Sequence, residues 1–417
     1  MHKHKYLPLL MWLFPLLFFA HQFILRLWPG LMMHQIMEQF SIDATSFGLM
    51  AACYYYGYAG MQIPIAIFLD RFGARLIVFL FAVLCGLATI LFTYSDHFGL
   101  ALLSRFLIGA GSAVGFLATS KVISEWFSKE SYARMIGFSF TFGLMGAVYG
   151  GKPVSLLIEA YSWQTVALAL GLISIGIGCA TYLILRSPKE GSTPKAPPLK
   201  LRDFGSLLSS RSIWLLALAN LLMVGSLEGF ADVWGVPYLM AAYHLAKSDA
   251  AGMVSFIFYG MLIGGPLLAF AAKRIGTYPV IALSGLGMAL AFVLLFLSPI
   301  YSWWLIAGLL FSIGVLCCYQ VIVFAAGSEL VSTQYLGVTV AFLNCINMLG
   351  GSFFHTLIGK IMDLYWTGAM GDNGIKHYSL EVYKYGLSLI PICAVMGAVI
   401  ICIVGFRSRQ LQLQSKG

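Results

Sequence analysis

The chain has 417 residues, of which 60% are hydrophobic and 10% charged, and its formal net charge is +9. Soluble domains carry about 25% charged residues, so this composition excludes a soluble globular protein and indicates a polytopic membrane protein. The basic residues form no amphipathic or disordered arm, which excludes a nucleic-acid-binding surface, and they follow the positive-inside rule instead.

Twelve apolar runs predict an all-α integral membrane protein, because about 20 apolar residues cross a bilayer. The first run continues past Arg26 and Pro29 without a cleavage site, so we interpret it as a retained span. If both termini are cytoplasmic, 17 of the 25 Lys and Arg residues lie on the inner face, which favours that orientation. The runs cover residues 7–34, 45–69, 76–95, 99–125, 135–159, 165–186, 213–241, 249–272, 278–297, 303–327, 337–362 and 385–406.

Residues 187–212 combine Pro, Gly, Ser and positive charge, which predicts a cytoplasmic linker held against anionic lipid. They separate an N-terminal six-helix bundle, residues 1–186, from a C-terminal one, residues 213–417. Three segments recur in the same order at nearly the same spacing, which predicts two similar halves. At an offset of 203 residues, Gly57 aligns with Gly260 and Gly73 with Gly276.

A charged turn, Asp70-Arg71-x-Gly73-x-Arg75, separates the second and third runs, and Arg105-Phe-Leu-Ile-Gly109 lies in the fourth. With two six-span halves and a basic central loop, these motifs resemble the major facilitator superfamily of secondary transporters. The resemblance implies two pseudo-symmetric bundles that work by alternating access. It also implies that Asp70 is a latch on the cytoplasmic side. The predicted gating residues are Asp70, Arg71, Arg75, Arg105, Glu125 and Glu329.

The sequence departs from the family pattern at three positions. Ala66 stands where the family has a glycine before the charged turn, and Lys273 replaces the acid in the second-half copy. These departures put a symmetric gating role for the two turns in doubt. Ala147 replaces the proline of the drug-exporter signature in the fifth span, which argues against drug/proton antiport.

Charged side chains at bilayer depth cost about 2.5–3.5 kcal/mol or more, so each needs a partner or a watery cavity. Arg26 and Asp232 lie at similar depth, and each precedes a tryptophan by two positions. The resemblance implies that the first and seventh spans face one another, so we expect this pair to meet or to contact a substrate. A permanent salt bridge between the halves is the alternative.

Glu228 lies one helical turn before Asp232. Two such carboxylates repel when both are ionised, which raises the proton affinity of at least one of them. The spacing therefore predicts proton coupling by Glu228 and Asp232. Permanent neutralisation by a neighbouring base is the alternative.

Lys121 and Lys152, with Arg26, predict a positive cavity that favours a small anion bearing a carboxylate or phosphate. Snorkelling to the interface is the alternative for Lys121. For the polar and aromatic candidates, helix-to-helix hydrogen bonds are the alternative. The remaining predicted substrate contacts are Tyr56, Gln62, Trp234, Tyr259, Tyr319, Gln320, Asn344 and Asn347.

These features predict a proton-coupled carrier of a small organic anion, with a proton-driven exporter of lipophilic or cationic compounds as the alternative. A channel is a further alternative, but two similar halves with a charged latch favour a carrier. Catalytic and nucleotide-binding motifs are absent from the sequence, so we expect neither an enzyme nor a cofactor. The eight cysteines lie in apolar runs and indicate no metal site. Short loops without a glycosylation sequon favour a bacterial inner membrane, and we expect a monomer.

Overall fold

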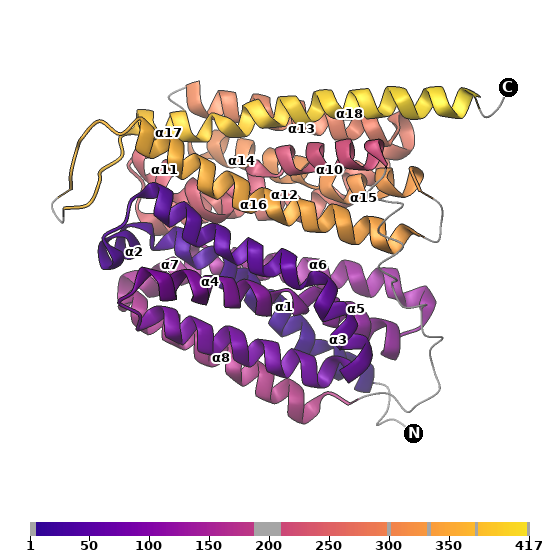
Figure 1. The fold of residues 1–417 in the computed structure, drawn as a ribbon, viewed down its shortest axis with the longest axis horizontal. Coiled ribbons are helices and arrows are strands. Elements are labelled where there is room, and N and C mark those ends of the chain that lie inside the picture. Colours follow the sequence, from indigo (N-terminus) through magenta and orange to yellow (C-terminus); the bar gives the residue numbers. More distant parts are fainter. Residues whose placement is uncertain (1–5, 187–209, 298–301, 332–334, 372–373, 415–417) are drawn as a thin grey trace. The chain divides into compact units, whose positions relative to one another are not determined.

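The computed structural model describes residues 6–186, 210–297, 302–331, 335–371 and 374–414. Contacts divide the chain into two compact units. The first unit comprises residues 1–42 and 49–196, and the second comprises residues 43–48 and 197–417. Figure 1 draws the helices of the first unit in indigo to magenta and those of the second in pink to yellow. Most of the predicted linker lies outside the described residues, and the predicted domain boundaries stay a prediction.

The first unit is built around α1, which packs against α4, α5, α6 and α8. α1 takes this central position because it is long and apolar and many of its residues are buried. Its helices are α1 (Leu7–Leu31), α2 (Met33–Phe40), α3 (Ala44–Thr93), α4 (Phe98–Ser112), α5 (Val114–Trp126), α6 (Lys129–Gly150), α7 (Lys152–Ala160) and α8 (Trp163–Ile184). The first turn of α3, however, clusters with the second unit.

In the second unit α12 packs against α14, α13 against α18, and α10 against α16 and α18. The segment between α10 and α11 is a π-helix, η1. The elements are α10 (Arg211–Met223), η1 (Gly225–Trp234), α11 (Gly235–Tyr243), α12 (Lys247–Ile275), α13 (Thr277–Leu297), α14 (Trp303–Cys317), α15 (Tyr319–Glu329), α16 (Leu336–Leu364), α17 (Leu380–Leu387) and α18 (Leu389–Gln414).

Among the described residues, ten helical segments are long and apolar enough to cross a membrane. One of them, α3, covers both the second and the third predicted runs and is interrupted at Gly73. The fifth predicted run corresponds to α6 and α7, which are separated by non-helical backbone at Gly151. The exact count of twelve spans and the cytoplasmic location of the termini stay predictions.

Gly57 and Gly260, which the predicted repeat aligns, each allow two helices to pack closely. A Cβ atom on Gly57 would lie 2.1 Å from the carbonyl oxygen of Phe106, and one on Gly260 would lie 2.1 Å from that of Phe311. No side chain fits at such distances, so the α3–α4 and α12–α14 crossings both need glycine. The two aligned positions therefore have the same local role, one in each unit, and the repeat itself stays a prediction.

Candidate functional site

The first unit places Arg105 by a close helix crossing. A Cβ atom on Gly109 would lie 1.8 Å from the carbonyl oxygen of Tyr54, so α4 touches the backbone of α3 there. Arg105 lies one turn before Gly109 on the same helix. Its guanidinium consequently lies over the ring of Tyr54, 5.0 Å from the centroid, and 5.8 Å from the ring of Trp28.

Arg105 also ties α4 to the C-terminal third of α1. The side chain is only 1% exposed. Its Nη1 donates a hydrogen bond of 2.8 Å to the carbonyl oxygen of Leu25, and its Nη2 donates one of 3.4 Å to that of Arg26. A buried guanidinium that bonds backbone carbonyls fixes their position. Arg105 therefore supports the segment of α1 that carries Arg26.

Arg26 is buried among aromatic side chains, with 9% of its surface exposed. Its guanidinium lies 5.3 Å from the ring centroid of Tyr55 and 5.8 Å from that of Phe23. The neighbouring Tyr54 hydroxyl donates a hydrogen bond of 2.9 Å to Oε1 of Gln22 on α1. The structure thus gathers two buried arginines and several phenol rings in one region of the first unit.

The second unit carries its buried acids on η1, where the sequence predicted an α-helix. All ten residues of η1 are buried; Glu228 is 1% and Asp232 3% exposed. A Cβ atom on Gly225 would lie 2.5 Å from the ring of Phe354, and one on Gly229 would lie 3.1 Å from its Cβ. The two glycines leave room for this ring against the widened turn. π-Helical segments within α-helices are frequent at functional sites.

Several predicted polar residues meet near η1. η1, which carries Glu228, packs against α10 and α14, and Cys317 and Tyr319, at the junction of α14 and α15, are fully buried. The Tyr319 hydroxyl donates a hydrogen bond of 3.2 Å to the carbonyl oxygen of Asn220. Sequence reasoning missed Asn220, although an amide inside an apolar run was a usable signal. Polar groups from α10, η1 and α15 therefore share one part of the second unit.

Arg26 lies in the first unit and Asp232 in the second, and their predicted pairing stays a prediction. Lys152 is exposed at the start of α7, while Tyr56 and Tyr259 are 44% and 38% exposed. The ring of Trp234, which is fully buried, contacts that of Phe47. Gln62, Gln320 and Asn344 are half-buried, and Asn347 is buried.

The charged turn of the first unit is held by Lys121. Its Nζ lies 2.8 Å from Oδ1 of Asp70 and 3.4 Å from Oε1 of Glu125. The structure thus links Lys121 to two of the predicted gating residues. The snorkelling alternative and the role as a substrate ligand both stay untested, whereas the contact with the turn is direct.

The other predicted gating residues also make local contacts. Nε of Arg75 donates a hydrogen bond of 2.6 Å to the carbonyl oxygen of Tyr182, whose ring lies 4.6 Å from the guanidinium. Arg71 lies over the ring of Phe72. In the second unit Oε1 of Glu329 accepts a hydrogen bond of 2.8 Å from the Thr277 hydroxyl, just after the repeat glycine.

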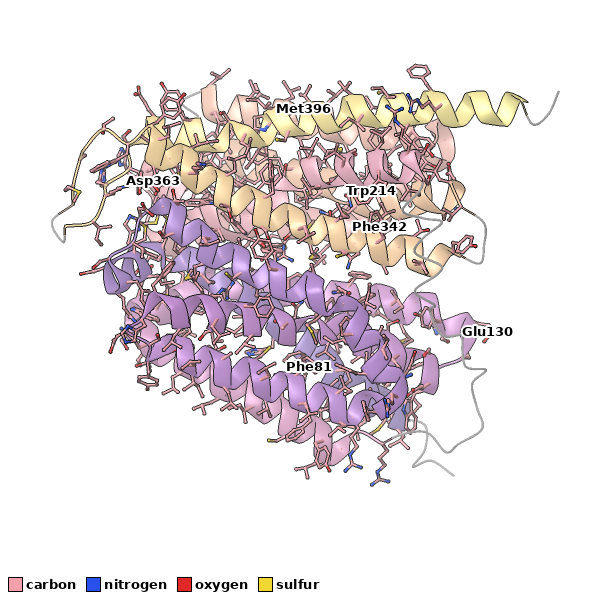
Figure 2. The ribbon with its side chains drawn as sticks, in the orientation of Figure 1. Phe81, Glu130, Trp214, Phe342, Asp363 and Met396 are labelled. Carbon is pink, nitrogen blue, oxygen red and sulfur yellow. The ribbon has the colours of Figure 1, made fainter. Side chains whose placement is uncertain are left out.

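A polar cluster around Asp363 was not predicted as a site. Asp363 accepts hydrogen bonds from the backbone N–H of Thr45 at 2.7 Å, from Nζ of Lys376 at 2.9 Å and from the Tyr378 hydroxyl at 2.6 Å. The Thr45 hydroxyl donates to the same carboxylate. Figure 2 labels Asp363 at the end of α16, next to the loop that follows. We call Asp43, Thr45, Asp363, Lys376 and Tyr378 the Asp363 cluster.

The Asp363 cluster holds the first turn of α3. Asp43 caps that turn, since its Oδ1 accepts a hydrogen bond of 2.9 Å from the backbone N–H of Ser46. Burial opposes the charged form of Lys376, but its hydrogen bond with Asp363 and the charges of Asp363 and Asp43 outweigh burial and raise its pKa. The sequence signal was the charges of Asp43, Asp363 and Lys376 at the ends of apolar runs or between them. Residues 372–373 of the loop that carries Lys376 lie outside the described residues.

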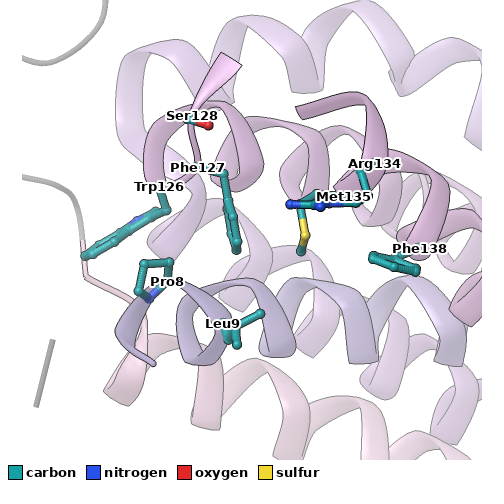
Figure 3. Close-up of a pocket in the computed structure, with 8 residues that line it drawn as sticks. All are labelled: Pro8, Leu9, Trp126, Phe127, Ser128, Arg134, Met135 and Phe138. Atoms are coloured by element: carbon teal, nitrogen blue, oxygen red, sulfur yellow. The ribbon is translucent and has the colours of Figure 1, made fainter. Parts of the chain in front are cut away.

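Figure 3 shows a shallow pocket of about 470 Å³ in the first unit. The start of α1, the end of α5 and the start of α6 surround it. None of the predicted site residues lines it. Its lining residues are Pro8, Leu9, Trp126, Phe127, Ser128, Arg134, Met135 and Phe138. Across the described residues, no group of three or more His, Cys, Asp or Glu side chains is placed to hold a metal ion.

Apolar helices of membrane-spanning length, several of which carry buried charges, are typical of a multi-pass integral membrane protein. The family model described as "Major Facilitator Superfamily" matches residues 12–355. The chain therefore belongs to the major facilitator superfamily, and it is a transporter and not an enzyme.

Solved structures agree on the fold. A bacterial homolog to the human lysosomal transporter Spinster, in an inward-facing and unoccupied conformation, matches with a TM-score of 0.76 and 18% identity over 96% of each chain. The nucleoside transporter NupG matches with a TM-score of 0.73 and 13% identity over 97% of this chain and 99% of that one. At such identities the likeness concerns the fold alone.

Three relatives are similar in sequence. A probable L-galactonate transporter of Escherichia coli is 22% identical, over 79% of this chain and 77% of that protein. The hexuronate transporter of Bacillus subtilis is 23% identical over 40% of this chain and 39% of that protein. An uncharacterized transporter of Bacillus subtilis, YybO, is 30% identical, but the match spans only 34% of this chain and about a third (32%) of that protein.

Proposed function

We propose that this chain is a secondary active transporter that moves a small organic anion across a bacterial inner membrane by alternating access, coupled to protons. The observation that carries this proposal is the burial of Arg26, five residues before the end of α1, among aromatic rings. A guanidinium kept at that depth is costly, and it binds carboxylate or phosphate with two parallel hydrogen bonds. Arg26 is therefore the proposed anion ligand.

The acids of η1 are the proposed proton carriers. Glu228 and Asp232 are both almost fully buried and lie four residues apart. Carboxylates buried inside membrane spans serve as proton relays in transporters, so this pair is placed to bind and release a proton. Protonation of this pair would then accompany binding of the anion, which has the opposite charge.

Alternating access needs contacts that hold one conformation and break in the other. The Lys121 contacts with Asp70 and Glu125 are the proposed latch of the inner face. The names of the relatives support an anionic substrate, because galactonate and hexuronate are both organic acids.

Uptake into proteoliposomes under an imposed inward proton gradient tests the proposal. A panel of labelled carboxylates and phosphate esters is offered, with and without the protonophore that collapses the gradient. We expect gradient-dependent uptake of at least one anion, at least tenfold weaker apparent affinity in Arg26→Gln, and loss of the gradient effect in Asp232→Asn. Lys360→Gln, at an exposed position on α16, is the matched charge-removal control.

Two results would decide against the proposal. Proton-driven extrusion of a lipophilic cation, with no uptake of any anion, would support the exporter instead, and Glu228 and Asp232 would then recognise the cation. Single-channel conductance in a planar bilayer would instead indicate a channel.

A further inference from the structure

Gln320 on α15 and Asn347 on α16 form a buried amide pair. Nδ2 of Asn347 donates a hydrogen bond of 3.3 Å to Oε1 of Gln320. Asn347 is only 1% exposed. The other two polar atoms of the pair, Nε2 of Gln320 and Oδ1 of Asn347, are also buried and have no hydrogen-bond partner among the described residues. The pair therefore leaves one donor and one acceptor unsatisfied.

The presence of one unsatisfied donor and one unsatisfied acceptor does not depend on how the two amides are oriented. If both amides are turned over, Gln320 becomes the donor within the pair, and one acceptor and one donor again remain. Leaving a buried polar atom unsatisfied costs about 1–3 kcal/mol, so two such atoms favour any group that bonds both. A hydroxyl group does so, because it accepts one hydrogen bond and donates another.

Charged groups fit this pair less well. A carboxylate only accepts hydrogen bonds, so it would satisfy Nε2 of Gln320 but face the lone pairs of Oδ1 of Asn347. An ammonium group only donates and has the opposite mismatch. The chemistry thus separates this site from Arg26, which suits the anionic group of a substrate.

The surroundings add further amide groups. Nδ2 of Asn220 on α10 bonds the carbonyl oxygen of Leu343, which lies one turn before Asn347 on α16, at 3.5 Å. Oδ1 of Asn220 is buried and finds no hydrogen-bond partner in the part of the chain that the structure describes. Tyr319, next to Gln320, bonds the backbone of Asn220. Three helices of the second unit therefore bring amide side chains into one neighbourhood.

From this geometry we infer that the substrate is a hydroxylated organic anion and that Gln320 and Asn347 bind one of its hydroxyl groups. The inference rests on the proposed function, because it assumes that the cargo is an anion. It adds the requirement that the cargo also carries hydroxyl groups, and it assigns their recognition to the second unit.

Matched acids test the inference in proteoliposomes under the same proton gradient. Glucarate and adipate both have six carbons and two carboxylates, and tartrate and succinate both have four carbons and two carboxylates; only the first of each pair is hydroxylated. In the unaltered protein we expect kcat/KM for the hydroxylated member to exceed that for its partner at least tenfold. In Gln320→Leu and Asn347→Leu this preference should fall below threefold, with uptake of the bare acid changed less than twofold.

Thr356→Val is the matched control. It removes a hydroxyl group from another turn of α16 without changing the shape of the side chain, so the preference should stay as in the unaltered protein. Thermal unfolding and gel filtration establish that each variant is folded. If Asn347→Leu fails to fold, Gln320→Leu, at a half-buried position, still decides the outcome.

The possible outcomes separate the two proposals. Equal uptake of both members of each pair, or an unchanged preference in the folded variants, overturns the hydroxyl inference and leaves anion transport standing. Preferential uptake of adipate or succinate also overturns it. Absence of gradient-driven uptake for all four acids, and for the wider anion panel, contradicts the proposed function itself.

Discussion

Gly73 and Gly276, which are 203 residues apart, adopt the same rare backbone conformation: φ is 78° and ψ 161° at Gly73, and φ is 96° and ψ 158° at Gly276. Residues with a side chain are strained in this region. The second unit therefore keeps the backbone of the charged turn although Lys273 has replaced the acid. The turn shape and the gating charge are separable properties of the repeat.

Gly276→Ala tests the need for this conformation. No atom outside the neighbouring residues lies closer than 3.6 Å to the added Cβ, so the expected effect is backbone strain alone. We expect a loss of about 1–3 kcal/mol in the free energy of unfolding, measured by denaturant unfolding in detergent. Gly265→Ala, in the open interior of α12, is the control and should gain about 0.5–1 kcal/mol. Equal effects of the two substitutions would show that the turn is not strained.

Gly314→Ala tests the helix crossing of the second unit. The added Cβ would lie 1.9 Å from the carbonyl oxygen of Ile257 on α12, so α12 and α14 must separate. Overpacking of this kind typically costs about 1–3 kcal/mol, and here the obstacle is backbone, so we expect the upper end of that range. Gly308→Ala, on the same helix with open space around it, should change the melting temperature little. A stable Gly314→Ala variant would mean that the crossing tolerates a side chain.

Asp70→Asn and Lys121→Gln test the inner latch. Asp70 is largely exposed, with 80% of its side-chain surface accessible, so each substitution should change the free energy of unfolding by less than about 1 kcal/mol. Both remove the same ion pair, so their effects on the transport rate should be alike and should not add in the double variant. Arg211→Gln, at an exposed position, is the control. Additive effects, or loss of substrate affinity with a normal rate of conformational exchange, would reject the latch.

Asp363→Asn tests whether the Asp363 carboxylate stabilises the first turn of α3. The carboxylate accepts the backbone N–H of Thr45, and hydrogen bonds to charged groups contribute about 1.5–3 kcal/mol. We expect amide hydrogen exchange in residues 43–48 to become at least tenfold faster. Glu381→Gln, an exposed acid on α17, is the matched control and should leave this exchange unchanged. Unaltered protection in Asp363→Asn would show that packing alone holds the segment.

The raised pKa of Lys376 gives a pH prediction for the same segment. A lysine whose pKa is higher in the folded state stabilises it below the unfolded pKa, about 10.4, and this contribution is lost only as the pH rises through the folded value. Protection of residues 43–48, corrected for the intrinsic exchange rate, should therefore stay constant between about pH 6 and 9. A loss of protection within that window would show that another titrating group stabilises residues 43–48.

The sequence was sufficient to predict the features that the bilayer requires of each separate segment. Long apolar runs predict helices because every backbone polar group must be satisfied inside its own segment. Gly57 and Gly260 were recognisable as a repeat because glycine is required wherever two helix backbones touch. The motif around Asp70 likewise indicated the family before any helix was placed.

The sequence did not predict contacts between segments that are far apart along the chain. Lys121 and Asp70 are 51 residues apart, and the apolar runs between them do not specify which helix faces which. The π-helix around Glu228 depends on Phe354, more than a hundred residues later, and the amide pair of Gln320 and Asn347 depends on how α15 packs on α16. The sequence by itself determined the apolar helices and the protein class, since these follow from local hydropathy and short motifs. Only tertiary packing decided which buried polar groups meet, since partners in a helix bundle are set by long-range side-chain fit.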